Sequence, residues 1–242
     1  MPSNQFTKLP AIILSAILGA VIYYGVEISS LDLWIQDYLY DFGQKEWLID
    51  QHSFWPRLIF YQLIKIPLVI VGMGALGLFL QTFYRSRYKQ NRWIFLYLFL
   101  CMVTVPLTVS SLKYISNTYC PWDISRYGGE KPYVKVLEAY PSTYAVPDRL
   151  GRCFPAGHAS GGFALLAIFF IVRGCRRKMM ALGFAMGVGW TMGIYQMLKG
   201  AHYFSHTLAT MILAWILCQV IYYLLATIVN SRQKTPMDPS KS

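Results

Sequence analysis

The chain is poor in charged residues. Only 14% of its 242 residues are Asp, Glu, Lys or Arg, whereas soluble domains contain about 25%. Hydrophobic residues make up 55% of the chain, and the mean hydropathy is +0.39. A soluble core of this size would need more polar surface to cover it, so the scarcity of charge indicates a membrane protein. The chain also lacks internal repeats, and we expect one domain.

Acidic residues are scarcer than basic ones, which gives a formal net charge of +11. The basic residues do not spread over a polar face, as a nucleic-acid-binding protein would require. They cluster in short links between apolar runs, as the positive-inside rule expects of cytoplasmic links. The clusters are Arg85, Arg87, Lys89 and Arg92, then Arg173, Arg176, Arg177 and Lys178, and finally Arg232, Lys234 and Lys241. We therefore expect no nucleic-acid partner.

The first apolar run has no small-residue cleavage site after it and a single basic residue, Lys8, before it. We expect a retained helix there rather than a signal peptide. Six runs are long enough, or nearly so, to span a bilayer. They cover residues 9–29, 57–84, 93–113, 157–173, 179–198 and 206–229. Lys65 and Pro67 interrupt the second run, which predicts a bend and a lysine that faces protein or water.

These runs predict an all-α polytopic membrane protein with about six transmembrane helices. We expect residues 1–56 to form a helix and an outer interfacial segment of one or two helices, residues 57–229 the core, and residues 230–242 a disordered cytoplasmic tail. The basic links place both termini in the cytoplasm and the loops 30–56, 114–156 and 199–205 outside. A bacterial-type cytoplasmic membrane is the expected location.

Three of the four histidines, His158, His202 and His206, lie at the outer ends of predicted helices. Ionisable groups at membrane depth are costly and tend to mark function. Three histidines are also a possible zinc ligand set. The basic residues nearby would repel a divalent cation and attract an anion, so we expect no metal and no cofactor. We interpret the fourth histidine, His52, as a packing or solvated residue.

The spacing of these residues forms a pattern. Lys113 is followed after six residues by "CP", "PAGH" stands at 155–158, and "QMLKGAHYFSH" stands at 196–206. Over about residues 90–229 this resembles the type-2 phosphatidic acid phosphatase (PAP2) superfamily, whose motifs are K-x6-R-P, P-S-G-H and S-R-x5-H-x3-D. The resemblance implies a membrane-embedded helical catalytic core.

The resemblance also implies residue roles. Lys113 binds phosphate, and Ala156 and Gly157 offer backbone amides. His202 attacks phosphorus and forms a phosphohistidine, while His158 protonates the leaving oxygen and then activates water. Each role suits the chemistry of the group, since imidazole serves as nucleophile, acid and base near neutral pH, and a helix N-terminus binds anions.

The chain departs from the family pattern at four positions. Cys120 and Gln196 stand where the motifs have arginine, Ala156 where they have serine, and His206 where they have aspartate. The alanine keeps its amide, but the two lost arginines remove bidentate phosphate donors. A histidine at 206 accepts a hydrogen bond from the nucleophile without a carboxylate's charge.

Other residues are candidates to replace the missing groups. Lys199 lies one turn from His202, Arg126 and Arg152 lie in the outer loop, and Asp123 is a candidate orienting carboxylate. The phosphate-binding set that we expect is Lys113, Ala156, Gly157, Lys199, Arg126, Arg152 and Gln196; the catalytic set is His202, His158 and His206.

Cys120 and Cys153 share the outer loop, where the predicted topology implies an oxidising compartment. If the two motifs meet around one phosphate, the flanking cysteines approach each other as well. We therefore expect a disulfide, with two independent thiols as the alternative.

The function expected is hydrolysis of a mono- or diphosphate from a membrane lipid at the outer face. The resemblance does not decide which lipid is the substrate. The candidates are undecaprenyl diphosphate, lipid A, phosphatidylglycerol phosphate and phosphatidic acid. The alternatives are a lipid-to-lipid phosphotransferase and a non-catalytic phospholipid binder or transporter with a decayed site.

Overall fold

The computed structural model describes residues 5–142 and 150–234, the side chains of 232–234 excepted. Its elements are η1 (Gln5–Thr7), α1 (Leu9–Ile28), α2 (Leu31–Leu39), β1 (Tyr40–Asp41), β2 (Glu46–Trp47), α3 (Phe54–Arg57), the π-helix η2 (Leu58–Leu63), α4 (Ile64–Tyr84), α5 (Ser86–Lys89), α6 (Arg92–Ile115), η3 (Pro121–Asp123), η4 (Ser125–Tyr127), α7 (Gly157–Ala164), α8 (Ala167–Ile171), α9 (Cys175–Leu198) and α10 (Phe204–Lys234).

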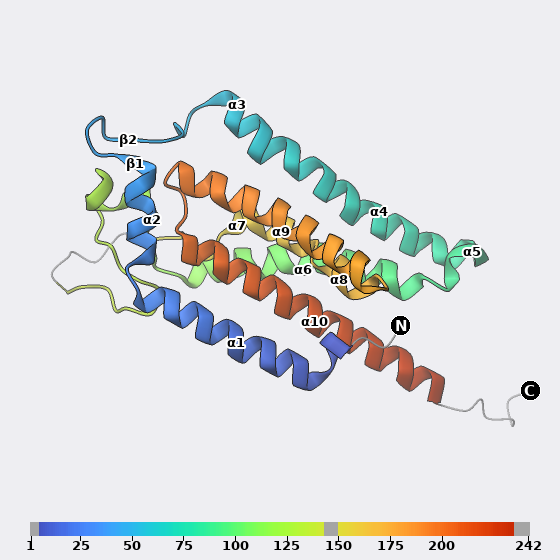
Figure 1. Ribbon diagram of the computed structural model, residues 1–242. Coiled ribbons are helices and arrows are strands. Elements are labelled where there is room, and N and C mark those ends of the chain that lie inside the picture. The colour runs from blue at the N-terminus through green and yellow to red at the C-terminus, as the bar shows by residue number, and fades with distance from the viewer. Residues whose placement is uncertain (1–4, 143–149, 235–242) are drawn as a thin grey trace, which may run out of the picture.

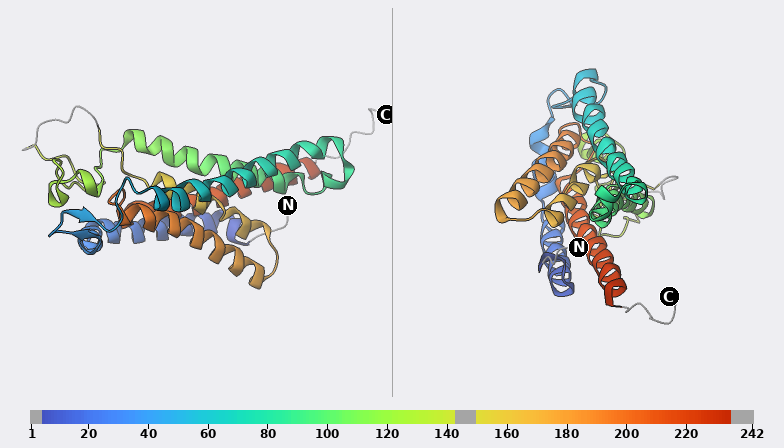
Figure 2. Two further views of the ribbon diagram at one scale, coloured as in Figure 1. Left: turned by 90° about the horizontal axis from the view of Figure 1, so that it is seen from above. Right: turned by 90° about the vertical axis from the view of Figure 1, so that its right-hand side faces the viewer.

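The long helices run side by side as a bundle, which confirms an all-α membrane protein (Figures 1 and 2). Four helical segments are long and apolar enough to cross a membrane: Leu9–Ile28, Phe54–Tyr84, Arg92–Ile115 and Phe204–Ser231. The other two predicted runs are also helical. Gly157–Ile171 is shorter and broken between α7 and α8, and α9 is long but less apolar. The two ends of the bundle differ, with α2 and the β-hairpin at one end and α5 at the other (Figure 1).

The core of the bundle surrounds α7 and α8, which contact α6, α9 and α10. The backbones of α7 and α9 approach closely, because a Cβ placed on Gly162 would lie 2.8 Å from backbone atoms of Gly189. Small residues at such crossings let membrane helices pack tightly. The helix that begins with the "PAGH" segment is therefore held on several sides.

The outer faces of the bundle are apolar. On α1, for example, Leu14, Ile17 and Val21 are each more than half exposed, at 57%, 56% and 63%. A soluble monomer rarely shows contiguous apolar surface of this extent. Such a surface is suited to contact with the acyl chains of a lipid bilayer.

The segment between α1 and α3 holds one helix, α2, and a two-stranded antiparallel hairpin in which Tyr40 pairs with Trp47. Rings of Tyr40, Trp47 and Tyr127 pack together and join this hairpin to η4. At the other terminus, α10 continues to Lys234. Residues 230–234, which the sequence analysis assigned to the tail, therefore belong to the helix, and residues 235–242 lie outside the described part.

Candidate active site

Lys113 occupies the last turn of α6, and its side chain reaches α7. A Cβ placed on Gly157 would lie only 3.5 Å from the Nζ atom of Lys113. The ammonium group therefore lies beside the first turn of α7, at ordinary van der Waals distance from this position. The first N–H groups of a helix have no intrahelical acceptor, so this turn and the lysine together favour an anion.

The segment before α7 does not present every amide as expected. The N–H of Ala156 donates to the backbone carbonyl of His206 at 3.2 Å, and the Ala156 carbonyl accepts from the hydroxyl of Thr210. These bonds fix the start of α7 against the first turns of α10. The Ala156 amide is thus structural here, while Gly157 and His158 begin the helix.

His202 follows a well-defined helix end. The N–H of Ala201 donates to the carbonyl of Gln196 at 2.8 Å, and the N–H of Gly200 donates to Met197 at 2.9 Å. Gly200 has a φ of +71°. This is a Schellman motif, in which glycine supplies the left-handed residue that closes α9. The sequence "KGAH" therefore turns the chain sharply and places His202 between α9 and α10.

The three predicted histidines come together. The ring centroids of His158 and His202 are 6.3 Å apart, and those of His202 and His206 are 5.9 Å apart. His206 Nδ1 lies 3.1 Å from the carbonyl oxygen of Cys153. Because a carbonyl only accepts, His206 carries its hydrogen on Nδ1. His206 thus holds the Cys153 backbone.

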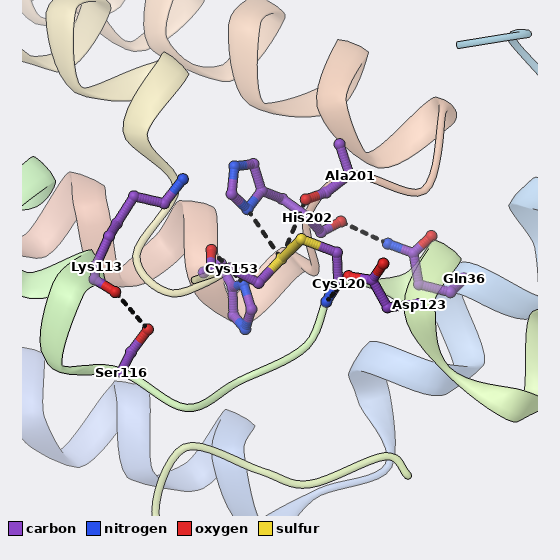
Figure 3. The surroundings of a disulfide bond; sticks show 9 residues. Gln36, Lys113, Ser116, Cys120, Asp123, Cys153, Ala201 and His202 are labelled. Atoms are coloured by element: carbon purple, nitrogen blue, oxygen red, sulfur yellow. Dashed lines mark hydrogen bonds between the residues drawn. A yellow bond between two sulfur atoms is a disulfide. The ribbon is translucent and has the colours of Figure 1, made fainter. Parts of the chain in front are cut away.

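Cys153 in turn contacts His202. Its Sγ atom lies 3.5 Å from His202 Nδ1. A disulfide sulfur has no hydrogen to give, so the Nδ1–H of His202 is the donor and Nε2 keeps a lone pair. Figure 3 shows the His202 ring between the disulfide and Lys113, with its second nitrogen on the side toward Lys113. Burial, followed by the charge of Lys113, lowers the pKa of His202 well below its ordinary value, which keeps the imidazole neutral.

The disulfide joins Cys120 to Cys153, as expected, with 5.2 Å between their Cα atoms (Figure 3). Backbone pairing brings the two segments together, since the N–H of Cys153 donates to the carbonyl of Thr118 at 3.0 Å. Among the described residues, the metal-ligand atoms that cluster within 4.8 Å are those of Cys120, Cys153 and His202. The disulfide removes both thiolates from that group, and the three histidines do not form such a cluster.

A cavity of about 540 Å³ opens beside these groups, between α4, α6 and α7. Lys65, Lys113 and His158 line its polar end, and apolar side chains such as Leu68, Met102 and Val103 line the rest. The Nδ1 atom of His158 is buried and has no hydrogen-bond partner among the residues that the structure describes. His202 is buried behind this cavity and does not line it.

The basic candidates of the outer loop face elsewhere. Arg126 forms a salt bridge with Asp37 at 2.7 Å, and Arg152 stacks on the ring of Tyr114 at 4.7 Å. The carboxylate of Asp123 accepts from the backbone N–H of Cys120 at 3.1 Å and so caps η3. In the described residues, none of these contacts joins Arg126, Arg152 or Asp123 to His158, His202 or His206.

Two further candidates remain near the site. Lys199 caps the end of α9 and is close enough to His158 for its charge to act on that imidazole. Burial, and then the charge of Arg57, lowers the pKa of Lys199. Gln196 is buried at 2% exposure, and its carbonyl accepts one of the bonds that close α9.

The motifs did not indicate that α2 contacts this site. Gln36 Nε2 donates to the backbone carbonyl of His202 at 2.8 Å, and the carboxylate of Asp32 accepts from both the N–H and the hydroxyl of Ser205. Asp32 thereby caps the first turn of α10. The spacing of Asp32 and Gln36 could have indicated this contact, because residues four apart share one face of a helix.

A lysine at the end of one helix, an imidazole at the start of a second and a buried imidazole before a third thus lie together at one end of the bundle. The PAP2 superfamily model matches residues 94–229, from α6 into α10, and the chain belongs to the PAP2 superfamily. The family indicates phosphatase-type activity on phosphate esters. No curated protein and no solved structure matches the chain.

Proposed function

We propose that the protein hydrolyses a mono- or diphosphate from a membrane lipid through a phosphohistidine on His202. The single observation that carries this proposal is the orientation of the His202 ring. Its Nδ1 lies against Cys153 Sγ at 3.5 Å, and its second nitrogen faces Lys113 (Figure 3). A neutral imidazole with a fixed Nδ1–H offers the Nε2 lone pair to an electrophile held beside Lys113.

The reaction has two steps. The Nε2 lone pair of His202 forms a bond to phosphorus, the bond from phosphorus to the lipid oxygen breaks, and His158 gives that oxygen a proton. Water then gives its proton to His158 and attacks phosphorus, which breaks the P–N bond and releases phosphate. The negative charge of the bound phosphate favours the protonated form of His158 in the first step.

Charge stabilisation comes from Lys113 and the first amides of α7. Phosphoryl transfer needs little from a protein beyond positioning and such a positive field. Lys199 is a further donor in the proposal, since its charge already acts on His158. The apolar walls of the cavity suit a lipid whose tail stays in the membrane while its phosphate enters.

The proposed setting follows from the basic links. They lie near α5 and between α8 and α9, whereas the site lies toward α2 (Figure 1). With basic links on the cytoplasmic side, the site faces the outer side of a cytoplasmic membrane.

Phosphate release from a lipid panel tests the proposal. Purified protein in detergent would receive undecaprenyl diphosphate, phosphatidylglycerol phosphate, phosphatidic acid and lipid A, with His202→Ala as the matched control. We expect release from at least one lipid by the wild type and none above background by the variant. Binding without release would favour a non-catalytic phospholipid binder. Release that requires a second acceptor lipid would favour a phosphotransferase.

A further inference from the structure

Lys65 is a charged residue within a membrane-spanning helical segment, Phe54–Tyr84. A lysine at membrane depth is costly and rarely faces lipid. The segment lies outside residues 94–229, so the family match assigns no role to it. Lys65 therefore calls for its own physical explanation.

Lys65 lies where the helix changes geometry. The π-helix η2 spans Leu58–Leu63, and α4 begins at Ile64 with Pro67 in its first turn. Proline has no N–H to give the Leu63 carbonyl, and its ring crowds that oxygen. The π-helix passes into α4 between Leu63 and Ile64, just before Lys65. Such π turns are frequent at functional sites.

A stack of side chains connects Lys65 to the start of α7. The Nζ atom of Lys65 lies 3.7 Å from the ring centroid of Tyr61. The Tyr61 ring in turn lies 4.6 Å from the imidazole of His158, centroid to centroid. The Tyr61 ring thus contacts both the ammonium group of Lys65 and the imidazole of His158.

Lys65 and Lys113 line the same cavity as His158, from α4 and α6 respectively. Both charges act on the His158 imidazole. Within residues 5–142 and 150–234, the one salt bridge joins Arg126 to Asp37, so neither lysine is neutralised by a carboxylate. Two ammonium groups facing one cavity without a counter-ion favour an anionic ligand.

We propose that Lys65 is a phosphate-binding residue of this site and contacts the substrate's phosphate opposite Lys113. This deepens the proposed function, on which it rests, by assigning it a residue from outside the family core. The ligand is a phosphate or diphosphate carried by a lipid, because the remainder of the cavity is apolar. The charge from α4 substitutes for the arginine side chains that Cys120 and Gln196 do not supply.

Orthovanadate, a phosphate mimic, separates this role from a purely structural one. Its binding would be measured by thermal shift in detergent for the wild type, Lys65→Met, Lys65→Arg and the exposed control Lys89→Met. Hydrogen bonds to charged groups contribute enough to predict a roughly 10- to 100-fold weaker vanadate affinity in Lys65→Met. Lys65→Arg and Lys89→Met should stay within about threefold of the wild type, a change smaller than the roughly 10-fold lower limit expected for Lys65→Met. An unchanged affinity in Lys65→Met would overturn the proposal.

A second measurement needs no variant to fold. Reductive methylation of the wild type, read by mass spectrometry, would be compared with and without inorganic phosphate. Phosphate should protect Lys65 and Lys113 but not Lys89. Protection of Lys113 without Lys65 would contradict the proposal. Lipid hydrolysis by the wild type tests the proposed function separately, since absent hydrolysis with Lys65-dependent vanadate binding would overturn that function and retain the phosphate site.

Discussion

His202 Nδ1 lies 3.5 Å from the Sγ atom of Cys153, so the disulfide forms one wall around the proposed nucleophile. In the family pattern an aspartate occupies position 206, and here His206 instead holds the carbonyl of Cys153 at 3.1 Å. The link from His206 to the proposed nucleophile, His202, therefore runs through Cys153. A sulfur acceptor orients the ring but supplies no negative charge.

Removal of the disulfide should lower both stability and turnover. The bond closes a separation of 33 residues, which corresponds to about 3–4 kcal/mol in the chain-entropy model. We expect Cys120→Ser to lower the Tm in detergent and to reduce lipid hydrolysis, because the wall beside His202 loosens. Cys175→Ser, at an exposed free cysteine, is the matched control. Equal Tm values for the two variants would contradict the assigned role of the bond.

The accessibility of the two cysteines offers a direct check in cells. A membrane-impermeant maleimide should label Cys120 and Cys153 only after reduction. Labelling of both without reductant would show free thiols and remove the basis of the preceding prediction.

Asp32 should make stability depend on pH. Burial raises the pKa of its carboxyl from 3.8 to about 6, despite the hydrogen bonds from Ser205, which lower it. The folded protein therefore holds this proton more tightly than the unfolded chain. The resulting stability is fully present below pH 3.8 and is lost as the pH rises through about 6. Asp32→Asn should remove this component, which thermal unfolding in detergent between pH 4 and pH 8 would measure.

The size of that component is on the order of 3 kcal/mol, since one pKa unit corresponds to about 1.4 kcal/mol. Other groups also titrate in this range, so the comparison is the difference between the wild type and Asp32→Asn at each pH. A constant difference would contradict the assignment of the raised pKa to Asp32.

Lys199 should contribute through its charge. It lies at the end of α9, with its Nζ 5.1 Å from the ring centroid of Tyr195. We expect Lys199→Gln to lower kcat by about 10²–10³, as loss of a donor to a transition-state oxygen typically does. Lys199→Arg should retain much more activity. Equal kcat values for both variants would show that Lys199 is an interfacial anchor only.

Divalent cations should not be required for hydrolysis. In the proposed mechanism, ammonium groups and backbone amides supply the positive field, and the disulfide removes two of the three ligands in the described Cys120, Cys153 and His202 cluster. Initial rates with and without EDTA should agree. A loss that zinc or magnesium restores would revive the interpretation of the histidines as metal ligands.

Hydropathy predicted the helical segments well, because burial in lipid demands long apolar runs. It did not predict the break between α7 and α8, where the N–H groups of Leu165 and Leu166 donate to carbonyls three residues back, those of Gly162 and Phe163. It also placed the end of the last helix at residue 229, whereas α10 includes Asn230 and continues to Lys234. Hydropathy does not distinguish polar residues in the last turns of a helix from the polar residues of a tail that follows it.

Motif spacing predicted which residues meet at the site but not how each is engaged. Lys113, His158 and His202 converge as the motifs implied. The pairing of Arg126 with Asp37 joins residues 89 apart in the chain, so no local pattern indicates it. Lys65 was visible as an interruption of an apolar run, but only the packing of α4 against α7 shows that it faces His158.

The most direct test of the account is isolation of the phosphoenzyme. Lipid labelled with ³²P in its terminal phosphate would be mixed with the wild type, His202→Ala and His158→Ala, and quenched in alkali, in which phosphohistidine survives. We predict an acid-labile label on His202 in the wild type, no label in His202→Ala, and slow turnover with retained labelling for a good leaving group in His158→Ala. Wild-type turnover by His202→Ala, or a label on another residue, would contradict the assignment of the nucleophile.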